Sequence, residues 1–212
     1  MEERLFYRGV LEAEYPSEWQ GRKNFDIQLM ADDEDNEAGF AEVGSIHGSL
    51  YIPDKSDKKT YEDVVEDADD YSEDEGVILL AVVNAIGEKM WKKKAPVRPI
   101  SIYRKRFSTP IAAIDRLYIH PQYRGEGYAR EAMSKISEIL NGLFALDRCD
   151  IGLVARSFEL GEKDVSNPQK ENIVLAPVER DGWLSKFYEG VGFSKVDGPL
   201  NVETDIFAKI SE

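Results

Sequence analysis

The 212-residue sequence has a single cysteine and no long apolar run. One cysteine excludes an intrachain disulfide framework and fits a reducing compartment. No segment approaches the roughly eighteen uninterrupted apolar residues that suggest a membrane-spanning helix. Residues 1–4 also lack the basic, then apolar, order of a signal peptide. We therefore expect a soluble cytoplasmic protein with no membrane partner, in which Cys149 is a half-buried strand residue and not a nucleophile.

Positive charge is also scarce. Lysine and arginine number 27 against 41 aspartates and glutamates, which gives a formal net charge of -14. General nucleic-acid binding needs clustered cations that displace phosphate counterions, so this balance argues against a nucleic-acid partner. Excess carboxylate suits a cationic substrate, but it also serves solubility, and composition leaves both interpretations open.

The chain does contain a clear strand, turn and helix between residues 111 and 144. Residues 111–119 are apolar and β-branched enough for an interior strand, which His120-Pro121 ends because proline cannot donate to the ladder. After the turn, apolar residues recur at three- and four-residue steps from Ala129 to Leu143. This spacing predicts one amphipathic helix.

Two glycines, Gly125 and Gly127, lie in the turn between this strand and this helix. Glycine allows positive φ and lets a ligand approach the main chain closely. Amides at a helix start can point together at an anion, so the loop suits a main-chain cradle for a pyrophosphate. An ordinary glycine turn explains the same spacing, and a short motif alone does not decide between the two.

The residues around these glycines carry a family resemblance. Residues 117–129, LYIHPQYRGEGYA, resemble the acyl-CoA loop of the GNAT superfamily of N-acetyltransferases, whose Q/R-x-x-G-x-G/A pattern is filled by Gln122, Gly125 and Gly127. Residues 184–193, LSKFYEGVGF, resemble the later F/L-Y-x-x-x-G-F block of that family. The resemblance covers about the last hundred residues of the sequence.

The resemblance implies an α/β fold with a mixed central β-sheet flanked by helices. Its two parallel strands, expected at residues 113–119 and 150–155, would splay apart and admit acyl-CoA between them. Acetyl-CoA is then the co-substrate, no metal is expected, and the main chain of residues 117–119 would pair with pantetheine like an added strand. By position, the implied coenzyme-binding residues are Leu117, Tyr118, Ile119, Gln122, Tyr123, Arg124, Gly125, Glu126, Gly127, Tyr128 and Ala129.

The resemblance also suggests catalytic residues. Tyr188 matches the tyrosine that protonates the departing thiolate in many family members, a role that suits a phenol with a pKa near 10. The alternative for Tyr188 is aromatic packing in a short helix. No general base is written in the sequence: Asp115 is the first candidate and His47 the second, and an ordered water chain could replace both. The family often has asparagine seven residues before the tyrosine, where this chain has Asp181.

We expect one domain over residues 1–212. Its parts are N-terminal strands (1–56, with strands at 5–11, 24–30 and 41–52), a helical pair (57–87), a basic loop (88–110) and an acyl-CoA-binding core (111–212). Capping signals at Thr60 and Ser72 start the two helices, and Gly87 is expected to end the second. The family places its first helices after the first strand, whereas here they follow the third.

Three segments leave their roles open. The lysines and arginines of residues 88–106 predict either a solvated loop or help in holding the coenzyme's 3′-phosphate. The carboxylates of residues 63–75 predict solvated helix faces or a funnel for a substrate amine. Residues 156–180 are longer than an ordinary connection, so we expect an insertion, with a substrate flap as one role for it.

Together these features predict an N-acetyltransferase that moves an acetyl group from acetyl-CoA to a primary amine, on a small cationic molecule or at a lysine or N-terminus. Its partners are then acetyl-CoA and the amine, with a homodimer left open. The alternative is a non-catalytic acyl-CoA-binding module with a regulatory or interaction role. A dinucleotide-binding oxidoreductase is excluded, because Arg130 stands where that motif needs its third glycine.

Overall fold

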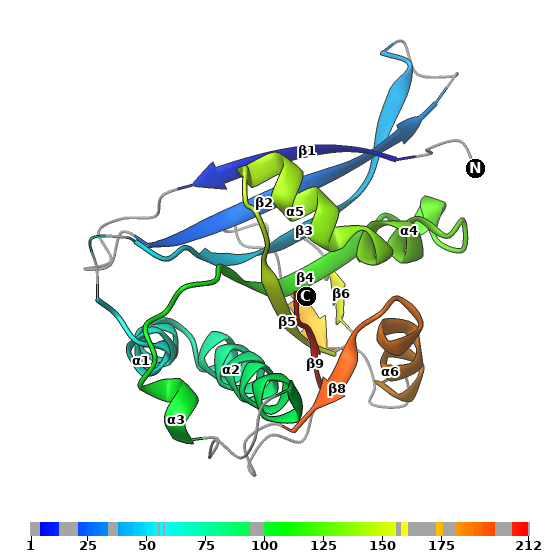
Figure 1. The fold of residues 1–212 in the computed structure, drawn as a ribbon. Helices are drawn as coiled ribbons and strands as arrows, with labels where there is room; N and C mark the ends of the chain where they lie inside the picture. The colour runs from blue at the N-terminus through cyan, green and yellow to red at the C-terminus, as the bar shows by residue number, and fades with distance from the viewer. Residues whose placement is uncertain are drawn as a thin grey trace.

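The computed structural model in Figure 1 describes residues 5–12, 21–33, 38–54, 56, 58–93, 100–155, 158–160, 173–175, 181–197 and 205–211. Over these residues, seven strands form one sheet in the order β1-β2-β3-β4-β5-β9-β8. The strands are β1 (Leu5–Glu12), β2 (Arg22–Asp32), β3 (Phe40–Tyr51), β4 (Ile111–Ile119), β5 (Asp150–Val154), β8 (Ser194–Val196) and β9 (Ile206–Lys209). The three predicted N-terminal strands are confirmed.

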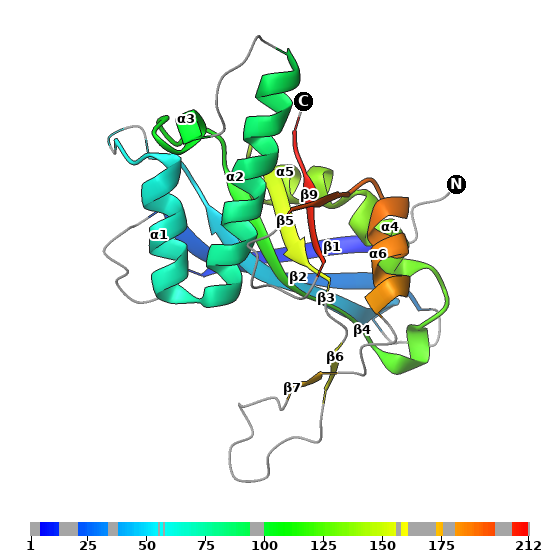
Figure 2. The same ribbon diagram turned by 90° about the horizontal axis from the view of Figure 1, so that it is seen from below.

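Helices cover both faces of this sheet (Figures 1 and 2). One face carries α1 (Tyr61–Tyr71), α2 (Glu73–Lys93) and the short α3 (Ile100–Tyr103), and the other carries α4 (Tyr128–Ser134) and α5 (Ile136–Phe144). A single turn, η1 (Pro121–Tyr123), precedes α4, and α6 (Asp181–Gly190) precedes β8. The order confirms that the first helices follow the third strand. No helix among the described residues is long and apolar enough to cross a membrane.

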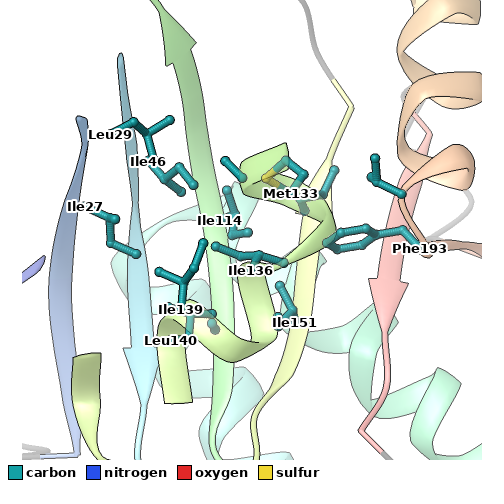
Figure 3. Close-up of a cluster of buried hydrophobic side chains, with 14 of the residues drawn as sticks. Ile27, Leu29, Ile46, Ile114, Met133, Ile136, Ile139, Leu140, Ile151 and Phe193 are labelled. Carbon is teal, nitrogen blue, oxygen red and sulfur yellow. The ribbon is translucent and has the colours of Figure 1, made fainter. Parts of the chain in front are cut away.

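The first half of β4 is buried on both of its faces, as an interior strand requires. Ala112 and Ile114 pack in the core under α4 and α5, whereas Ile111 and Ala113 pack in the core under α1, α2 and α3. Figure 3 shows the first of these cores, where Met133, Ile136 and Leu140 of the helices meet Ile114 and Ile151 of the sheet. The apolar positions of residues 129–143 therefore face the sheet, as their spacing predicts.

The central strands β4 and β5 part at their carboxyl ends. They pair in parallel from Ile111 with Asp150 to Ile114 with Leu153, and the other pairs of this sheet are antiparallel. Beyond Ile114 the strand β4 continues to Ile119 along β3 alone, while β5 follows β9. The predicted mixed sheet with splayed parallel strands is thus confirmed.

A β-bulge lies where the two strands part. His47 of β3 pairs with Arg116 of β4, and the next residue, Gly48, pairs with Ile114, so Asp115 is left over. An extra residue of this kind bends its strand and re-aims the side chains around it. After the bulge, Leu117 and Ile119 pack on the same core as Ile114, which strict alternation would not allow. Asp115 is therefore placed by an irregularity of the strand.

Gly87 does not end the second helix, as expected from the sequence, because α2 continues to Lys93. A Cβ at Gly87 would lie 3.3 Å from Cγ2 of Ile102 on α3, so the glycine serves close helix packing.

Ser72 is the C-cap of α1, with its backbone N–H bonded to the carbonyl of Ala68. The capping box at Thr60 is confirmed, since Thr60 and Asp63 exchange side-chain and backbone hydrogen bonds.

The single helix predicted after the glycine turn is interrupted at Lys135, which separates α4 from α5. There the carbonyl of Ser134 accepts a hydrogen bond of 3.1 Å from Nζ of Lys209 on β9. A contact between distant segments thus accompanies the break, and local sequence spacing carries no sign of it.

The basic segment is partly helical and not the loop that the sequence suggests. Its first residues extend α2, and α3 follows residues 94–99, which lie outside the described part. Figures 1 and 2 place α3 on the face opposite α4. The described part of the basic segment thus lies on the face opposite α4, and Lys94 and Arg98 lie outside the described residues, so the suggested contact with a 3′-phosphate stays a prediction. In the insertion, β6 (Phe158–Leu160) and β7 (Ile173–Leu175) form an antiparallel pair, and its other residues lie outside the described part.

Candidate active site

A cavity of about 430 Å³, the main cavity, opens where β4 and β5 part. It brings together most of the predicted site. Tyr188 and Asp115 both line it, as do Leu117, Tyr118, Ile119, Tyr123, Arg124, Gly125, Gly127, Tyr128 and Ala129. Gln122 and Glu126, the remaining implied coenzyme residues, are exposed and are not part of the lining.

The glycine loop forms one edge of this cavity. Gly125 and Gly127 have φ values of 92° and 91°, in the left-handed region where other residues are strained. A Cβ on either would meet no atom within 4 Å, so backbone conformation and not crowding requires glycine here. The open space in front of them is available to a ligand.

Gly127 is the N-cap of α4, and the first intrahelical bond runs from the amide of Glu131 to the carbonyl of Gly127. Helix geometry leaves the amides of Tyr128, Ala129 and Arg130 without acceptors inside the helix. These three residues line the main cavity. Amides and a helix start facing open space fit the phosphate groups of a coenzyme.

Two arginines add positive charge to this edge. Arg124 donates from Nε to the carbonyl of Ile119 at 3.0 Å, which ties the loop to the end of β4. Arg130 is exposed and lines the cavity, with its guanidinium 6.0 Å from the ring centre of Phe187. Arg130 was missing from the predicted site, although its place in the first turn of the helix after the loop could have indicated it.

The helix α6 supplies the opposite wall. Trp183, Leu184, Phe187 and Tyr188 line the cavity, and Trp183 stacks on Phe187 at 5.7 Å between ring centres. Trp183 remains 65% exposed, which is unusual for so large an apolar side chain. The four residues are spaced as one face of a helix, and this spacing could have found the first three from the sequence.

The block Tyr188-x-x-x-Gly192-Phe193 is the end of α6. The amide of Phe193 bonds to the carbonyl of Tyr188 at 3.1 Å, and that of Gly192 to the carbonyl of Glu189 at 3.1 Å. With Gly192 at a φ of 92°, these bonds form a Schellman motif. The rings of Tyr188 and Phe193 lie 6.0 Å apart, the apolar contact that accompanies such an ending. The motif fixes the position of Tyr188.

Tyr188 is only 8% exposed and is packed among aromatic rings. Phe187 and Phe207 have ring centres 5.1 and 5.6 Å from that of Tyr188. Burial raises the pKa of Tyr188 to about 12, because a phenolate would be poorly solvated there. The phenol therefore keeps its proton at neutral pH and is available as a donor. Tyr188 thus packs among aromatic rings and also lines the main cavity, and its role as general acid stays a prediction.

Asp115 lies between two cavities. Besides the main cavity, it lines a second cavity of about 300 Å³, the polar cavity, with Asp26, His47 and Glu75. Its carboxylate reaches solvent but is surrounded by protein in this hollow, and loss of hydration raises the pKa of Asp115. The nearby carboxylates of Glu75 and Asp74 raise this pKa further, whereas Arg116 and His47 lower it. A raised pKa moves a carboxylate toward the range useful for a base.

His47, the second candidate base, lies in the polar cavity and is outside the lining of the main cavity. Its Nδ1 is 3.3 Å from Oδ2 of Asp26, and its Nε2 is 2.9 Å from Oγ of Ser45. Both ring nitrogens thus have partners on the sheet, and His47 shares only the polar cavity with Asp115.

Cys149 is 2% exposed, which is deeper than the half-buried position expected, and it lies outside both cavities. Burial raises the pKa of the Cys149 thiol to about 12, so it carries no thiolate at neutral pH. Within the described residues, no group of three or more histidine, cysteine, aspartate or glutamate side chains is arranged to hold a metal ion.

A mixed sheet that opens between two parallel strands, beside a glycine loop at a helix start, defines the class of acyl-CoA-dependent acyltransferases. Comparison with family models gives the particular family. Residues 41–151, just over half of the chain, match the acetyltransferase (GNAT) family. The chain therefore belongs to the GNAT family and is an N-acetyltransferase, and the acyl donor that the family implies is acetyl-CoA.

Solved structures resemble the chain at low identity. They include a spermidine N-acetyltransferase chimera of SpeG from Vibrio cholerae and hSSAT (12% identity, 97% of this chain and 94% of that one, TM-score 0.38). An N-acetyltransferase from Staphylococcus aureus Mu50 matches at 14% identity over 90% and 70%, with a TM-score of 0.33. Arabidopsis thaliana NAA60, bound to a bisubstrate analogue, matches at 9% over 96% and 98%, with a TM-score of 0.39. Likeness at this level carries no information on the substrate. No curated protein matches the chain.

Proposed function

We propose that this acetyltransferase moves the acetyl group of acetyl-CoA onto a primary amine, with Tyr188 as general acid and Asp115 as general base. The observation that supports this most is that both side chains line one cavity, which the glycine loop also edges. Two titratable groups at one site whose surroundings adjust them for opposite tasks are typical of acid and base pairs.

The position of Asp115 suits an amine that enters from the polar cavity. The acceptor nitrogen attacks the thioester carbonyl and forms the new C–N bond. The nitrogen must then lose a proton, and we assign this proton to the carboxylate of Asp115 because Asp115 lines both cavities. Breaking the C–S bond completes the transfer and leaves the coenzyme as a thiolate.

Tyr188 then donates its phenolic proton to that thiolate sulfur, and solvent later exchanges protons with both side chains. A phenol with a pKa of about 12 is a weak acid for an ordinary thiolate. Burial also raises the pKa of a thiol, so a coenzyme sulfur that leaves beside the aromatic rings of α6 would be a better proton acceptor than one in water. Burial beside α6 therefore makes the difference between the pKa of the Tyr188 phenol and that of the coenzyme thiol smaller.

The substitution Tyr188→Phe tests the assignment. It keeps the ring packing and removes the proton, so kcat should fall by about 10²- to 10⁴-fold with little change in acetyl-CoA affinity. Free thiol release with an amine panel measures kcat, and calorimetry measures the affinity. Tyr61→Phe is the matched control, because Tyr61 is also buried but packs on Phe107 under the opposite face.

An unchanged kcat in Tyr188→Phe would remove Tyr188 from the mechanism. If acetyl-CoA binds but no amine releases thiol above the hydrolytic rate, the alternative of a non-catalytic acyl-CoA-binding module takes the place of acetyl transfer.

A further inference from the structure

The polar cavity has a volume and a position suited to the acceptor. Its volume of about 300 Å³ is that of a small-molecule site. It lies over β2, β3 and β4, and shares Asp115 with the main cavity, so an acceptor held here has one end at the reaction centre. Its charge therefore bears on which amines react.

Arg22 and Glu75 both line the polar cavity, and their opposite charges neutralise each other. Arg22 is 5% exposed in its side chain and bonds to both carboxylate oxygens of Glu75, from Nε at 3.1 Å and from Nη2 at 2.8 Å. Ser49 donates to the same carboxylate at 2.9 Å, and so does the hydroxyl of Tyr51. The ring of Tyr71 covers the guanidinium at 3.3 Å. This closed network leaves neither Arg22 nor Glu75 to neutralise a ligand.

Two carboxylates in the lining remain, Asp26 and Asp115. Asp26 places Oδ2 at 3.3 Å from Nδ1 of His47. Its other oxygen, Oδ1, is buried and has no hydrogen-bond partner among the described residues. The side chain of Asp26 is nevertheless 48% exposed, so a cationic group in the cavity can approach its carboxylate. The charge of Asp115 is offset only in part, by Arg116 outside this lining and by His47 within it.

The two carboxylates are spaced for a molecule with two charged ends. In the strand register, Asp26 of β2 lies opposite His47 of β3, and His47 lies opposite Arg116 of β4, the neighbour of Asp115. The two aspartates are therefore separated by two strand spacings, about 10 Å. Two ammonium groups joined by a short alkyl chain span such a gap once each lies within hydrogen-bonding distance of its carboxylate. A monoamine can satisfy only one of the two.

We propose that the acceptor is an aliphatic diamine or polyamine, whose second ammonium group is held by Asp26 while the reacting amine lies at Asp115. This rests on the proposed function and adds the substrate class. Amines that also carry a carboxylate, such as free amino acids, are disfavoured by repulsion from both acids. Asp26 is therefore the residue that selects for a second positive charge.

The test compares 1,4-diaminobutane with butylamine, which differ in the second ammonium group, by following thiol release from acetyl-CoA. The unaltered protein should show kcat/KM for the diamine at least tenfold above that for the monoamine. In Asp26→Asn the diamine value should fall by about 10- to 100-fold, the loss expected for one charge-assisted hydrogen bond. The monoamine value should stay within about twofold, since Asp26 does not contact the reacting nitrogen in this scheme.

Asp32→Asn is the matched control, because Asp32 lies on the same strand but is exposed and outside the cavity. It should leave both values unchanged. Equal kcat/KM for the two amines, or an equal loss for both in Asp26→Asn, would overturn the diamine proposal and leave acetyl transfer intact. Failure to acetylate any amine while acetyl-CoA binds would overturn both proposals.

Discussion

Asp115, the general base that we propose, is a side chain whose ionised form disfavours the fold. Its folded pKa is raised, chiefly by loss of hydration. For such a group the contribution to stability is complete below the unfolded pKa and is lost as pH rises through the folded pKa. At neutral pH the ionised carboxylate therefore disfavours the native state, and a neutral amide in its place would not.

Asp115→Asn should accordingly separate stability from activity. At neutral pH we expect the free energy of unfolding to rise by less than about 1 kcal/mol, since solvent reaches the side chain. The difference from the unaltered protein should vanish below about pH 3.9, the ordinary aspartate pKa. The kcat of Asp115→Asn should be about 10²- to 10⁴-fold below that of the unaltered protein, which is the usual contribution of a positioned base. Urea unfolding at two pH values and thiol release measure the two effects.

A destabilised Asp115→Asn variant would show that the carboxylate supports the fold. Asp32→Asn, on the exposed end of β2, serves as the control for removing one negative charge.

At the scale of elements, the end of α6 places the candidate acid. Gly192 adopts a φ of 92°, and a Cβ there would meet only the end of Lys209, at 3.9 Å. The strain of substitution is therefore conformational. Gly192→Ala should lower the free energy of unfolding by about 1–2 kcal/mol, as measured by urea denaturation.

Gly182→Ala, in the first turn of the same helix, is the contrasting variant. Gly182 does not have a positive φ, and an added Cβ there would meet no atom within 4 Å. Alanine should be neutral or stabilising by up to about 1 kcal/mol, since it restricts the unfolded chain. Equal destabilisation by both substitutions would contradict the assignment of the Schellman motif.

Elements whose signals are local were predictable from the sequence. The glycine turn at residues 125–127 and the cap at Thr60 depend on backbone conformation and near neighbours, and the structure has both. Gly87 shows the limit of such reasoning. Its sequence surroundings suit a helix end, yet the glycine is used for packing against Ile102 of α3. Glycine often ends a helix, but at Gly87 the packing of α2 on α3 decides its role.

The polar side of the site was less predictable, because it depends on pairings across the fold. Arg22 and Glu75 are 53 residues apart, and no local spacing indicates that their charges cancel. The position of Asp115 follows from a bulge in the register with β3, which the sequence does not show. The carboxylates of residues 63–75 therefore could not be sorted into solvated and site residues in advance, although Glu75 proves to line the polar cavity.

At the scale of the molecule, coenzyme binding should stabilise the whole fold, because the main cavity joins the loop before α4, the strands β4 and β5, and the helix α6. Acetyl-CoA at a hundred times its Kd should contribute about 2.7 kcal/mol. For a chain of 212 residues, this corresponds to a Tm increase of about 5–10 °C. Thermal unfolding with and without acetyl-CoA measures the increase.

The variant Gly127→Asp provides the control for that measurement, because it places a carboxylate where the phosphates are expected. It should show no Tm increase with acetyl-CoA. An increase of the same size in Gly127→Asp would show that the coenzyme binds elsewhere on the molecule.

If the two substrates occupy the two cavities that share Asp115, as we propose, the kinetic mechanism can be predicted. Among the described residues that line the main cavity there is no cysteine, serine or lysine to take up the acetyl group, and Cys149 is buried away from it. We therefore expect both substrates to be bound together, so double-reciprocal plots at several fixed amine concentrations should intersect. Parallel lines would instead reveal an acetylated enzyme. If no acetylated enzyme forms, acetyl-CoA that binds in the absence of an amine is not converted. In a cell with little amine substrate, we therefore expect the enzyme to accumulate as its complex with acetyl-CoA.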